Sequence, residues 1–354
     1  MSAAAARETW IDALKGWGML LIVIGHVWSL SDVPVWYMWM FSFHVPLFFF
    51  ASGLTLKPDT LPLGSFLRRR VGTVLVPYLF YALVGYGFYL AGYFAAAAAG
   101  KTVAQFAYGL WWPLFGVFYG SVGDGLLVNS PLWFLPALFL AQGVVYALHR
   151  LGWTWWARYA ALLVLFAITA TIEERIKLPM SLLPAMGAAV FVQIGLDFRR
   201  WRAWPHWSRA THWGWLAGLL ALSLLSPLNG AVGLAGPTVN QPVLFLLFAL
   251  IGIGFSVQLA RLLDAALPWL AVLGRHSMGI LVTHMLAIKG VKVLMSLATG
   301  ISLDTMEHSN AWSLAVLAIA AVLMVPAIWV IERWLPWTLG NRRPAAAGAV
   351  TGSR

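Results

Sequence analysis

The chain has 354 residues, of which 61% are hydrophobic and only 10% are charged. A soluble domain carries about 25% charged residues, so the composition excludes a water-soluble globular protein and indicates helices surrounded by lipid. The net charge of +11 does not indicate a nucleic-acid partner, because the positive residues stand at the ends of apolar stretches, and the lack of Cys excludes disulfides and a thioester on the protein itself.

Apolar stretches separated by charged or Gly- and Pro-rich breaks predict an all-α polytopic membrane protein, a bundle of about ten transmembrane helices. The predicted spans are 11–30, 36–56, 71–96, 131–149, 153–172, 179–198, 212–232, 241–262, 269–290 and 311–332. The aromatic, glycine-rich segment 101–130 is too broken for a span, so we expect an interfacial or re-entrant piece there. Residues 1–340 then form one membrane domain, and the small, basic residues 341–354 form a disordered cytoplasmic tail.

The distribution of positive residues predicts the orientation. With the N-terminus in the cytoplasm and alternate crossings, 18 of the 23 Lys and Arg residues fall on the cytoplasmic side. Short loops on that side of a membrane carry an excess of Lys and Arg. Both termini are therefore expected in the cytoplasm.

The first span, in the segment ETWIDALKGWGMLLIVIGHVWSL, contains Asp12, Lys15 and His26. An ionisable group in a membrane helix costs a few kcal/mol, so it requires a partner or a water-filled cavity. Lys15 and His26 fall within about 20° of the same helix face and about 16 Å apart along the axis, and Asp12 lies on nearly the same face. This face indicates a working site, although Asp12 and Lys15 also fit a simple interfacial pair and His26 a structural histidine.

The second span, WYMWMFSFHVPLFFFASG, places His44 about eight residues into the helix, at a depth similar to that of His26. Two imidazoles in the outer half of the bilayer could face each other. Histidine suits acid–base chemistry because its ordinary pKa is near 6.5. Pro46 should loosen the local hydrogen-bond ladder and leave carbonyls to line a cavity, and a kink needed only for packing explains it equally well.

Three later features each allow two interpretations. The run Arg68, Arg69 and Arg70 fits a topology anchor or a clamp for donor phosphates, and both can hold together. Trp133 and Phe134, in PLWFLPALF, fit an aromatic belt or a surface for sugar rings. In LGRHSMGILVTHM, His276 and His284 are eight residues apart and need not share a site; the deeper His284 fits either a structural or a ligand-binding role.

Taken together, IDALKGWGMLLIVIGH, FSFHVPLFFFASG, the basic run before VPYLF, PLWFLPALF and LGRHSMGILVTH resemble acyltransferase family 3 in order along nearly the whole chain. The family consists of bacterial membrane acyltransferases that modify carbohydrates. The resemblance places its basic residue and catalytic histidine, ten intervening positions apart, on Lys15 and His26, and its FHxPLFFxxSG motif on residues 43–53. The family's arginine pair falls on Arg70 and Thr73, so the second arginine is missing, and Arg69 or Arg68 would have to replace it.

The resemblance implies transfer of an acetyl or other acyl group from cytoplasmic acyl-CoA, such as acetyl-CoA, to a sugar hydroxyl. The implied acceptor is a sugar or lipid-linked oligosaccharide of a surface glycan or exopolysaccharide, as in xanthan-type acetylases, and the implied location is the bacterial inner membrane, in contact with lipid. No metal is expected. The expected site residues are His26, His44 and Asp12 for catalysis, Lys15, Arg69 and Arg70 for the donor, and Trp133, Phe134 and His284 for the substrate.

Two alternatives remain open at the level of the sequence. Within the enzyme class, His26 could itself be acylated and pass the group on to an acceptor outside. From another class, a proton-coupled transporter would also place His and Asp residues inside the membrane, although it has no need for a phosphate clamp on one face.

Overall fold

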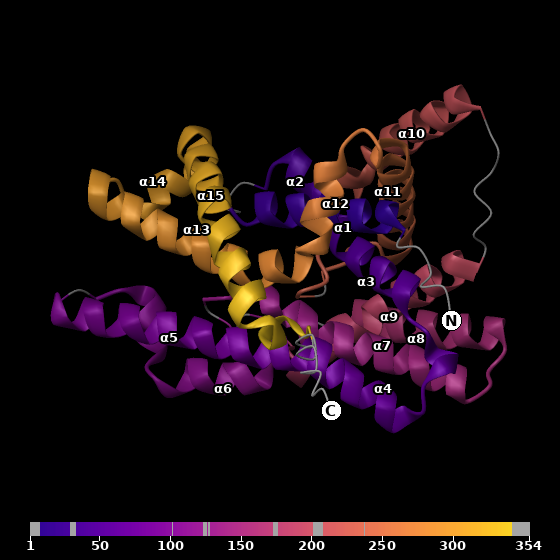
Figure 1. Cartoon of the computed structure of the whole chain (residues 1–354), viewed down its shortest axis with the longest axis horizontal. Coiled ribbons are helices and arrows are strands. Elements are labelled where there is room, and N and C mark those ends of the chain that lie inside the picture. The colour runs from indigo at the N-terminus through magenta and orange to yellow at the C-terminus, as the bar shows by residue number, and fades with distance from the viewer. Residues whose placement is uncertain are drawn as a thin grey trace, which may run out of the picture.

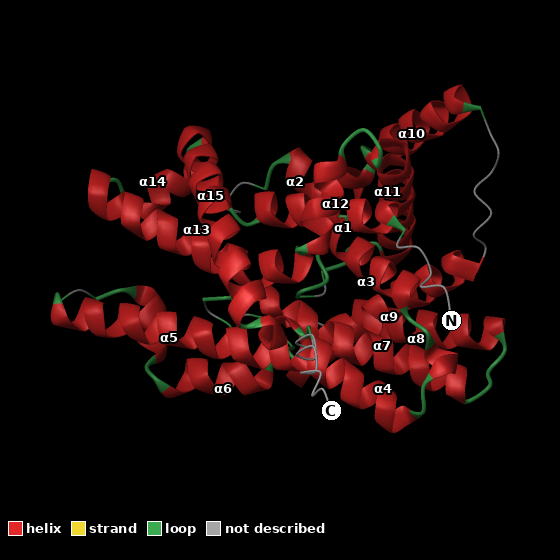
Figure 2. Ribbon diagram, viewed as in Figure 1, coloured by secondary structure: helices red, strands yellow, loops and turns green. Residues whose placement is uncertain are grey.

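The computed structural model describes residues 8–28, 33–100, 102–122, 126, 128–172, 176–200, 208–236 and 238–341. These residues form helices and no named strand, apart from one isolated antiparallel bridge between Gly233 and Thr238 (Figure 2). Within them, seven helical stretches are long and apolar enough to cross a membrane. The all-α polytopic membrane fold is therefore confirmed. All of the predicted tail except Asn341 lies outside the described residues.

The helices, labelled as in Figure 1, are α1 (Thr9–Gly25), α2 (Val35–Phe41), α3 (His44–Thr55), α4 (Leu63–Arg70), α5 (Val76–Ala98), α6 (Trp111–Tyr119), α7 (Phe134–Arg150), α8 (Trp155–Thr171), α9 (Leu182–Arg200), α10 (Arg209–Ser223), α11 (Pro242–Leu263), α12 (Pro268–Arg275), α13 (Ser277–Thr299), α14 (Leu303–His308) and α15 (Asn310–Trp334). A π-helical turn, Val71–Leu75, joins α4 to α5, and short 3-10 turns, among them Pro58–Thr60, Ser130–Trp133 and Pro336–Leu339, connect other helices.

The number of crossings stays a prediction. Three of the ten predicted spans correspond to α1, α8 and α10, which have 17, 17 and 15 residues and are shorter than the seven long stretches. The prediction that both termini are cytoplasmic is likewise untested. α6 has nine residues, too few to cross about 30 Å of hydrocarbon, and it packs on α5.

Two predicted spans are interrupted as regular helices, each at the position that a proline affects, although Val35–Thr60 still counts as one of the seven long apolar stretches. The stretch 36–56 is two helices, with α2 ending at Phe41 and α3 beginning at His44. A proline ring clashes with the carbonyl four residues earlier, and for Pro46 that carbonyl belongs to Ser42, at the break. Likewise α10 ends at Ser223, four residues before Pro227, rather than near residue 232. His44 is thus the first residue of a helix rather than a mid-helix residue.

The predicted span 269–290 is also wrong as one helix. His276 has φ −94° and ψ 11° and separates α12 from α13, which continues to Thr299. The His276 ring is hydrogen-bonded to the Glu332 carboxylate of α15 at 2.6 Å. The break therefore coincides with a polar tie between two distant helices.

The first helix lies at the centre of the molecule, where α3, α11, α12 and α13 pack against it (Figure 1). Its closest neighbour is α12. A Cβ added to Gly16 would come within 1.9 Å of the Leu270 carbonyl oxygen, and one added to Gly274 within 1.7 Å of the Asp12 carbonyl oxygen. Small residues let membrane helices approach backbone to backbone, so these glycines fix the position of α1.

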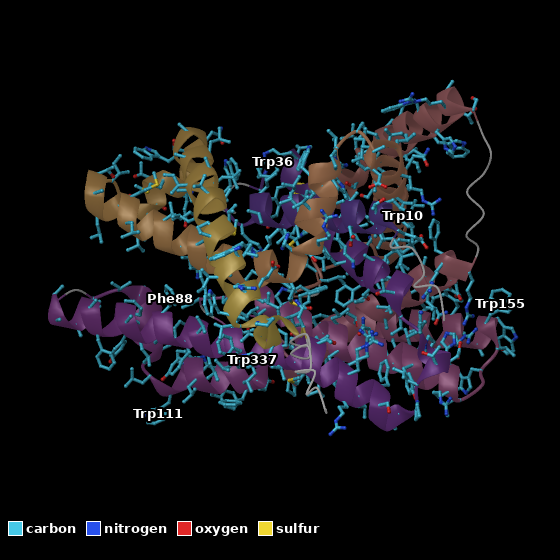
Figure 3. The ribbon with its side chains drawn as sticks, in the orientation of Figure 1. Trp10, Trp36, Phe88, Trp111, Trp155 and Trp337 are labelled. Carbon is cyan, nitrogen blue, oxygen red and sulfur yellow. The ribbon has the colours of Figure 1, made fainter. Side chains whose placement is uncertain are left out.

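The outer surface is strongly apolar. Figure 3 shows Trp111 and Trp155 at the margins of the molecule, where they are 78% and 69% exposed, and Phe88 on α5 is 55% exposed. Such residues on α5, α6 and α8 would be unfavourable in water and are typical of a surface that faces lipid or the membrane interface.

Candidate active site

Two histidines from distant parts of the sequence, His26 and His284, meet at the end of α1 that the predicted orientation places outside, and His44 lies near enough to act on His26 electrostatically. The rings of His26 and His284 are 5.4 Å apart, centroid to centroid, at an angle of 41°. His26 also interacts electrostatically with His44 and with Lys289. The predicted proximity of His26 and His44 is thus present in the structure, and His284 joins them.

The hydrogen bonds of His44 and His284 define which nitrogen of each ring carries a proton. In His44, Nδ1 lies 2.9 Å from the Met40 carbonyl oxygen, and in His284 it lies 2.9 Å from that of Ile280. A carbonyl only accepts, so we assign the proton to Nδ1 in both neutral rings, which leaves Nε2 as an acceptor. The Nε2 atom of His284 is buried and has no hydrogen-bond partner among the described residues. Such an atom suits a transient partner during a reaction.

A buried lysine holds the end of α1 beside this cluster. Lys292 is only 7% exposed, and its Nζ donates to the Val27 carbonyl oxygen at 2.8 Å and to the Glu307 carboxylate at 2.9 Å. Val27 follows His26 directly, so the lysine fixes the backbone that carries the imidazole. Sequence reasoning missed Lys292, Lys289 and Glu307, because nothing in their local sequence indicates a contact with the end of α1.

The other end of α1 carries Asp12 and Lys15, the two remaining predicted site residues of that helix. α1 is continuous from Thr9 to Gly25, so the predicted separation of about 16 Å between Lys15 and His26 holds along its axis. Asp12 is buried and lies about 21 Å from His26 by the same measure. Asp12 therefore cannot touch the histidine cluster, and it lies instead where α1 crosses Gly274 of α12.

The arginine run lies on α4, separate from α1. Arg68 and Arg69 are exposed, whereas Arg70 is half-buried, with its guanidinium 5.6 Å from the centre of the Phe66 ring. The Arg70 Nε atom is buried without a hydrogen-bond partner among the described residues. Thr73, at the position of the missing second arginine, donates its hydroxyl to the Arg69 carbonyl at 2.9 Å. Among the three arginines of the run, Arg70 is thus the one whose side chain is held by packing.

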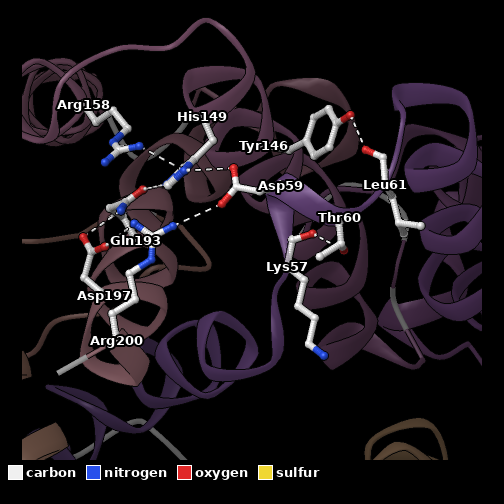
Figure 4. A network of polar contacts seen from close by, with 10 residues as sticks. All are labelled: Lys57, Asp59, Thr60, Leu61, Tyr146, His149, Arg158, Gln193, Asp197 and Arg200. Carbon is white, nitrogen blue, oxygen red and sulfur yellow. Dashed lines mark hydrogen bonds and ion pairs between the residues drawn. The ribbon is translucent and has the colours of Figure 1, made fainter. Parts of the chain in front are cut away.

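A polar network fixes the loop before α4 (Figure 4). Arg158 donates to Nδ1 of His149 at 2.9 Å, and Nε2 of His149 donates to the Gln193 side-chain oxygen at 3.2 Å. The Asp59 carboxylate accepts from Arg200 at 3.2 Å and lies 3.8 Å from Nδ1 of His149. These contacts tie the Pro58–Thr60 turn to α7, α8 and α9.

Two further contacts continue this support to α4 itself. The Tyr146 hydroxyl donates to the Leu61 carbonyl at 2.9 Å (Figure 4), and its ring stacks on Phe66 with centroids 4.1 Å apart. The Phe66 ring in turn contacts the Arg70 guanidinium. The network therefore positions the arginine run, although Arg68, Arg69 and Arg70 make none of its contacts.

The two predicted aromatic substrate residues point inward. Trp133 is 7% exposed. It therefore does not belong to an aromatic belt on the outer surface, which was one of its two interpretations. Phe134 packs on Phe48 and Phe49 of α3, with ring centroids 6.0 and 4.9 Å away. Phe134 thus supports the helix that begins at His44, and the Trp133 ring packs edge-on against Phe134 with centroids 6.3 Å apart. Just before them, Asn129 donates to the Val282 carbonyl of α13 at 3.0 Å, while its Oδ1 is buried without a partner among the described residues.

His276 stands apart from the cluster and contacts Glu332 instead. Within the described ranges, no group of three or more His, Cys, Asp or Glu side chains is arranged to hold a metal ion.

A family model described as an acyltransferase domain matches residues 8–337. No curated protein and no solved structure matches the chain. The match covers nearly all the described residues and includes every predicted site residue, from Asp12 to His284. It does not favour the transporter alternative.

Proposed function

The chain belongs to the acyltransferase family whose domain spans residues 8–337, and from that membership we propose that it transfers an acetyl or other acyl group from cytoplasmic acyl-CoA to a sugar hydroxyl, with His26 as general base. We assign this activity to one membrane domain, residues 1–340, in a bacterial inner membrane. The acceptor belongs to a surface glycan or exopolysaccharide. The observation that carries the proposal is the contact of the His26 and His284 rings at one end of α1, with His44 near enough to act on His26 electrostatically. The same helix carries Lys15 toward its other end.

The reaction requires one proton to be taken up and returned. The sugar hydroxyl oxygen attacks the thioester carbonyl carbon while His26 accepts the hydroxyl proton. The C–S bond then breaks, the ester remains on the sugar, and the proton passes to the departing CoA sulfur. His44 and His284, each with Nδ1 committed to a backbone carbonyl, offer Nε2 to orient the sugar or the attacking hydroxyl.

The donor enters from the opposite end. Lys15, Arg69 and Arg70 meet the CoA phosphates at the cytoplasmic side, and the pantetheine arm extends about 16 Å along α1 to His26. Asp12 acts as a positioning residue beside Lys15. Trp133 and Phe134 position the sugar, and Phe134 also packs against the His44 helix.

Arg70→Ala is expected to raise the KM for acyl-CoA about tenfold or more, because a charge-assisted bond to phosphate contributes about 1.5–3 kcal/mol. The change in kcat should be small, since the proposed contact of Arg70 is with the CoA phosphates and not with the reacting atoms. Steady-state kinetics of the purified protein check this, with Arg209→Ala, an exposed arginine at the start of α10, as the matched control. An unchanged KM in Arg70→Ala would remove Arg70 from the donor site.

Lys292→Met is expected to lower kcat and leave the KM for acyl-CoA unchanged, because it releases the Val27 carbonyl next to His26 and leaves the Glu307 carboxylate without this partner. Lys292→Arg keeps the charge and should restore part of the rate. Equal losses in both variants, or a change confined to KM, would show that Lys292 does not position His26.

The test in cells compares a bacterium that carries the gene with one from which it is deleted. We expect O-acyl groups on the surface or exported glycan to disappear on deletion and to return with the wild-type gene but not with the His26→Ala gene. Unchanged O-acylation in the deletion strain would overturn the assigned acceptor class.

A further inference from the structure

A large apolar cavity lies beside α1, bounded by α12, α13 and α15. Its volume is about 560 Å³, within the range of about 300–1,000 Å³ of ligand sites. The walls include Met19, Val23 and Ile280, and among the described residues the polar side chains that line it are those of His276 and Glu332. None of the roles proposed above uses this space.

The cavity begins beside the donor path and extends away from it around α1. At 100° per residue, its lining residues Met19, Val23, Leu20 and Ile24 cover a sector centred about 100° from the face of Lys15 and His26. Met19 and Val23 form the edge nearest to that face. The cavity thus runs alongside the donor path, and Val23 and Ile24 lie within one turn of His26.

The lining chemistry selects a hydrocarbon chain. The amides and hydroxyl of a pantetheine arm would find only the His276 and Glu332 side chains as polar partners, and burying unpaired polar groups is unfavourable. A hydrocarbon chain that enters from lipid exchanges one apolar surrounding for another and leaves no polar group unpaired. The ligand is therefore an aliphatic chain rather than the donor arm.

The opening of the cavity indicates where that chain comes from. Val325 and Trp329 of α15 line the cavity and are also 70% and 62% exposed on the apolar outer surface. In a polytopic membrane protein this surface faces the bilayer, so the cavity is continuous with lipid. A chain can enter sideways from the membrane without passing through water.

We propose that the cavity holds the hydrocarbon chain of a lipid-borne acceptor, so that the sugar to be acylated arrives on a membrane-anchored carrier; this rests on the proposed function. The chain lies along α1 beside the donor path, and the head group reaches the His26 cluster. Donor and acceptor thereby approach the same imidazole from two faces of one helix.

The test uses a hexadecyl glycoside with a photoactivatable diazirine in its chain, added to the full-length protein in proteoliposomes. After illumination, peptide mapping should find the label on α1, α13 and the inner face of α15. Ala321→Trp places a large ring in the cavity and should reduce this labelling by about tenfold or more. Val322→Trp, the next residue on α15, does not line the cavity and should label like wild type.

The outcomes distinguish this inference from the proposed function, because labelling requires no turnover. Labelling in Ala321→Trp equal to that of wild type, or label spread evenly over the lipid-facing helices, would overturn the cavity assignment even in an active enzyme. Label from a diazirine-bearing long-chain acyl-CoA at the same residues, in place of the glycoside, would also overturn it. In transfer assays, Ala321→Trp should lose activity toward the hexadecyl glycoside and keep it toward the methyl glycoside.

Discussion

Replacing His26 with alanine is expected to reduce acyl transfer by a factor of about 10²–10⁴, the usual contribution of a general base. The protein should still insert and fold, because no hydrogen bond of the His26 ring to another described residue joins the neighbouring helices, and α1 is held by α12 and by Lys292. Initial rates with purified protein, normalised to the amount of folded protein, measure the loss.

The matched control is His308→Ala, an exposed histidine on α14, which should retain the wild-type rate. His44→Ala and His284→Ala should each cost less than His26→Ala, because they orient the site and do not take the proton. A His26→Ala protein that transfers acyl groups at the wild-type rate would refute the assigned base.

The second large effect is expected from Gly274→Leu, which acts through packing rather than chemistry. Even the Cβ atom at this position would lie 1.7 Å from the Asp12 carbonyl oxygen, so α1 and α12 would have to separate. Overpacking of this kind costs about 1–3 kcal/mol or more. Because α1 carries both Lys15 and His26, activity should fall together with the thermal midpoint measured in detergent.

Gly218→Ala serves as the control for that substitution. Gly218 lies within α10, and an added Cβ would meet nothing within 4 Å. Alanine is favoured over glycine inside a helix by about 0.5–1 kcal/mol, so this variant should be at least as stable as wild type and equally active. A Gly274→Leu protein with wild-type stability would show that the close α1–α12 contact is not required.

The sequence predicts the class of the fold and the most important residue of the site for clear physical reasons. Long apolar stretches require lipid. An imidazole such as that of His26 is unfavourable in lipid unless it has a polar partner or a water-filled cavity, so it marks a site. The break before His44 could also be derived, since the ring of Pro46 clashes with the Ser42 carbonyl in a continuous helix and removes the hydrogen bond to it. The break at His276 could not, because it coincides with a contact to Glu332, 56 residues later in the chain.

Other parts of the site depend on contacts that no local pattern encodes. His284 fits a core histidine from its surroundings in the sequence, and only the packing of α13 against α1 brings it to His26. Lys292 reaches the Val27 carbonyl across 265 residues. The cavity likewise arises from helices that are far apart in the chain, and its lining residues look individually like any lipid-facing residue.

The most direct measurement follows radiolabelled acyl groups from acetyl-CoA in proteoliposomes that contain the purified chain and a glycoside acceptor. Label should appear on the sugar as an ester with wild-type protein and not with His26→Ala. Label that accumulates on wild-type protein when the acceptor is left out would indicate an acyl-histidine relay in place of a general base. Folded wild-type protein that moves no label to sugar or to itself would contradict the proposal that acyl-CoA is the donor and His26 the centre of transfer.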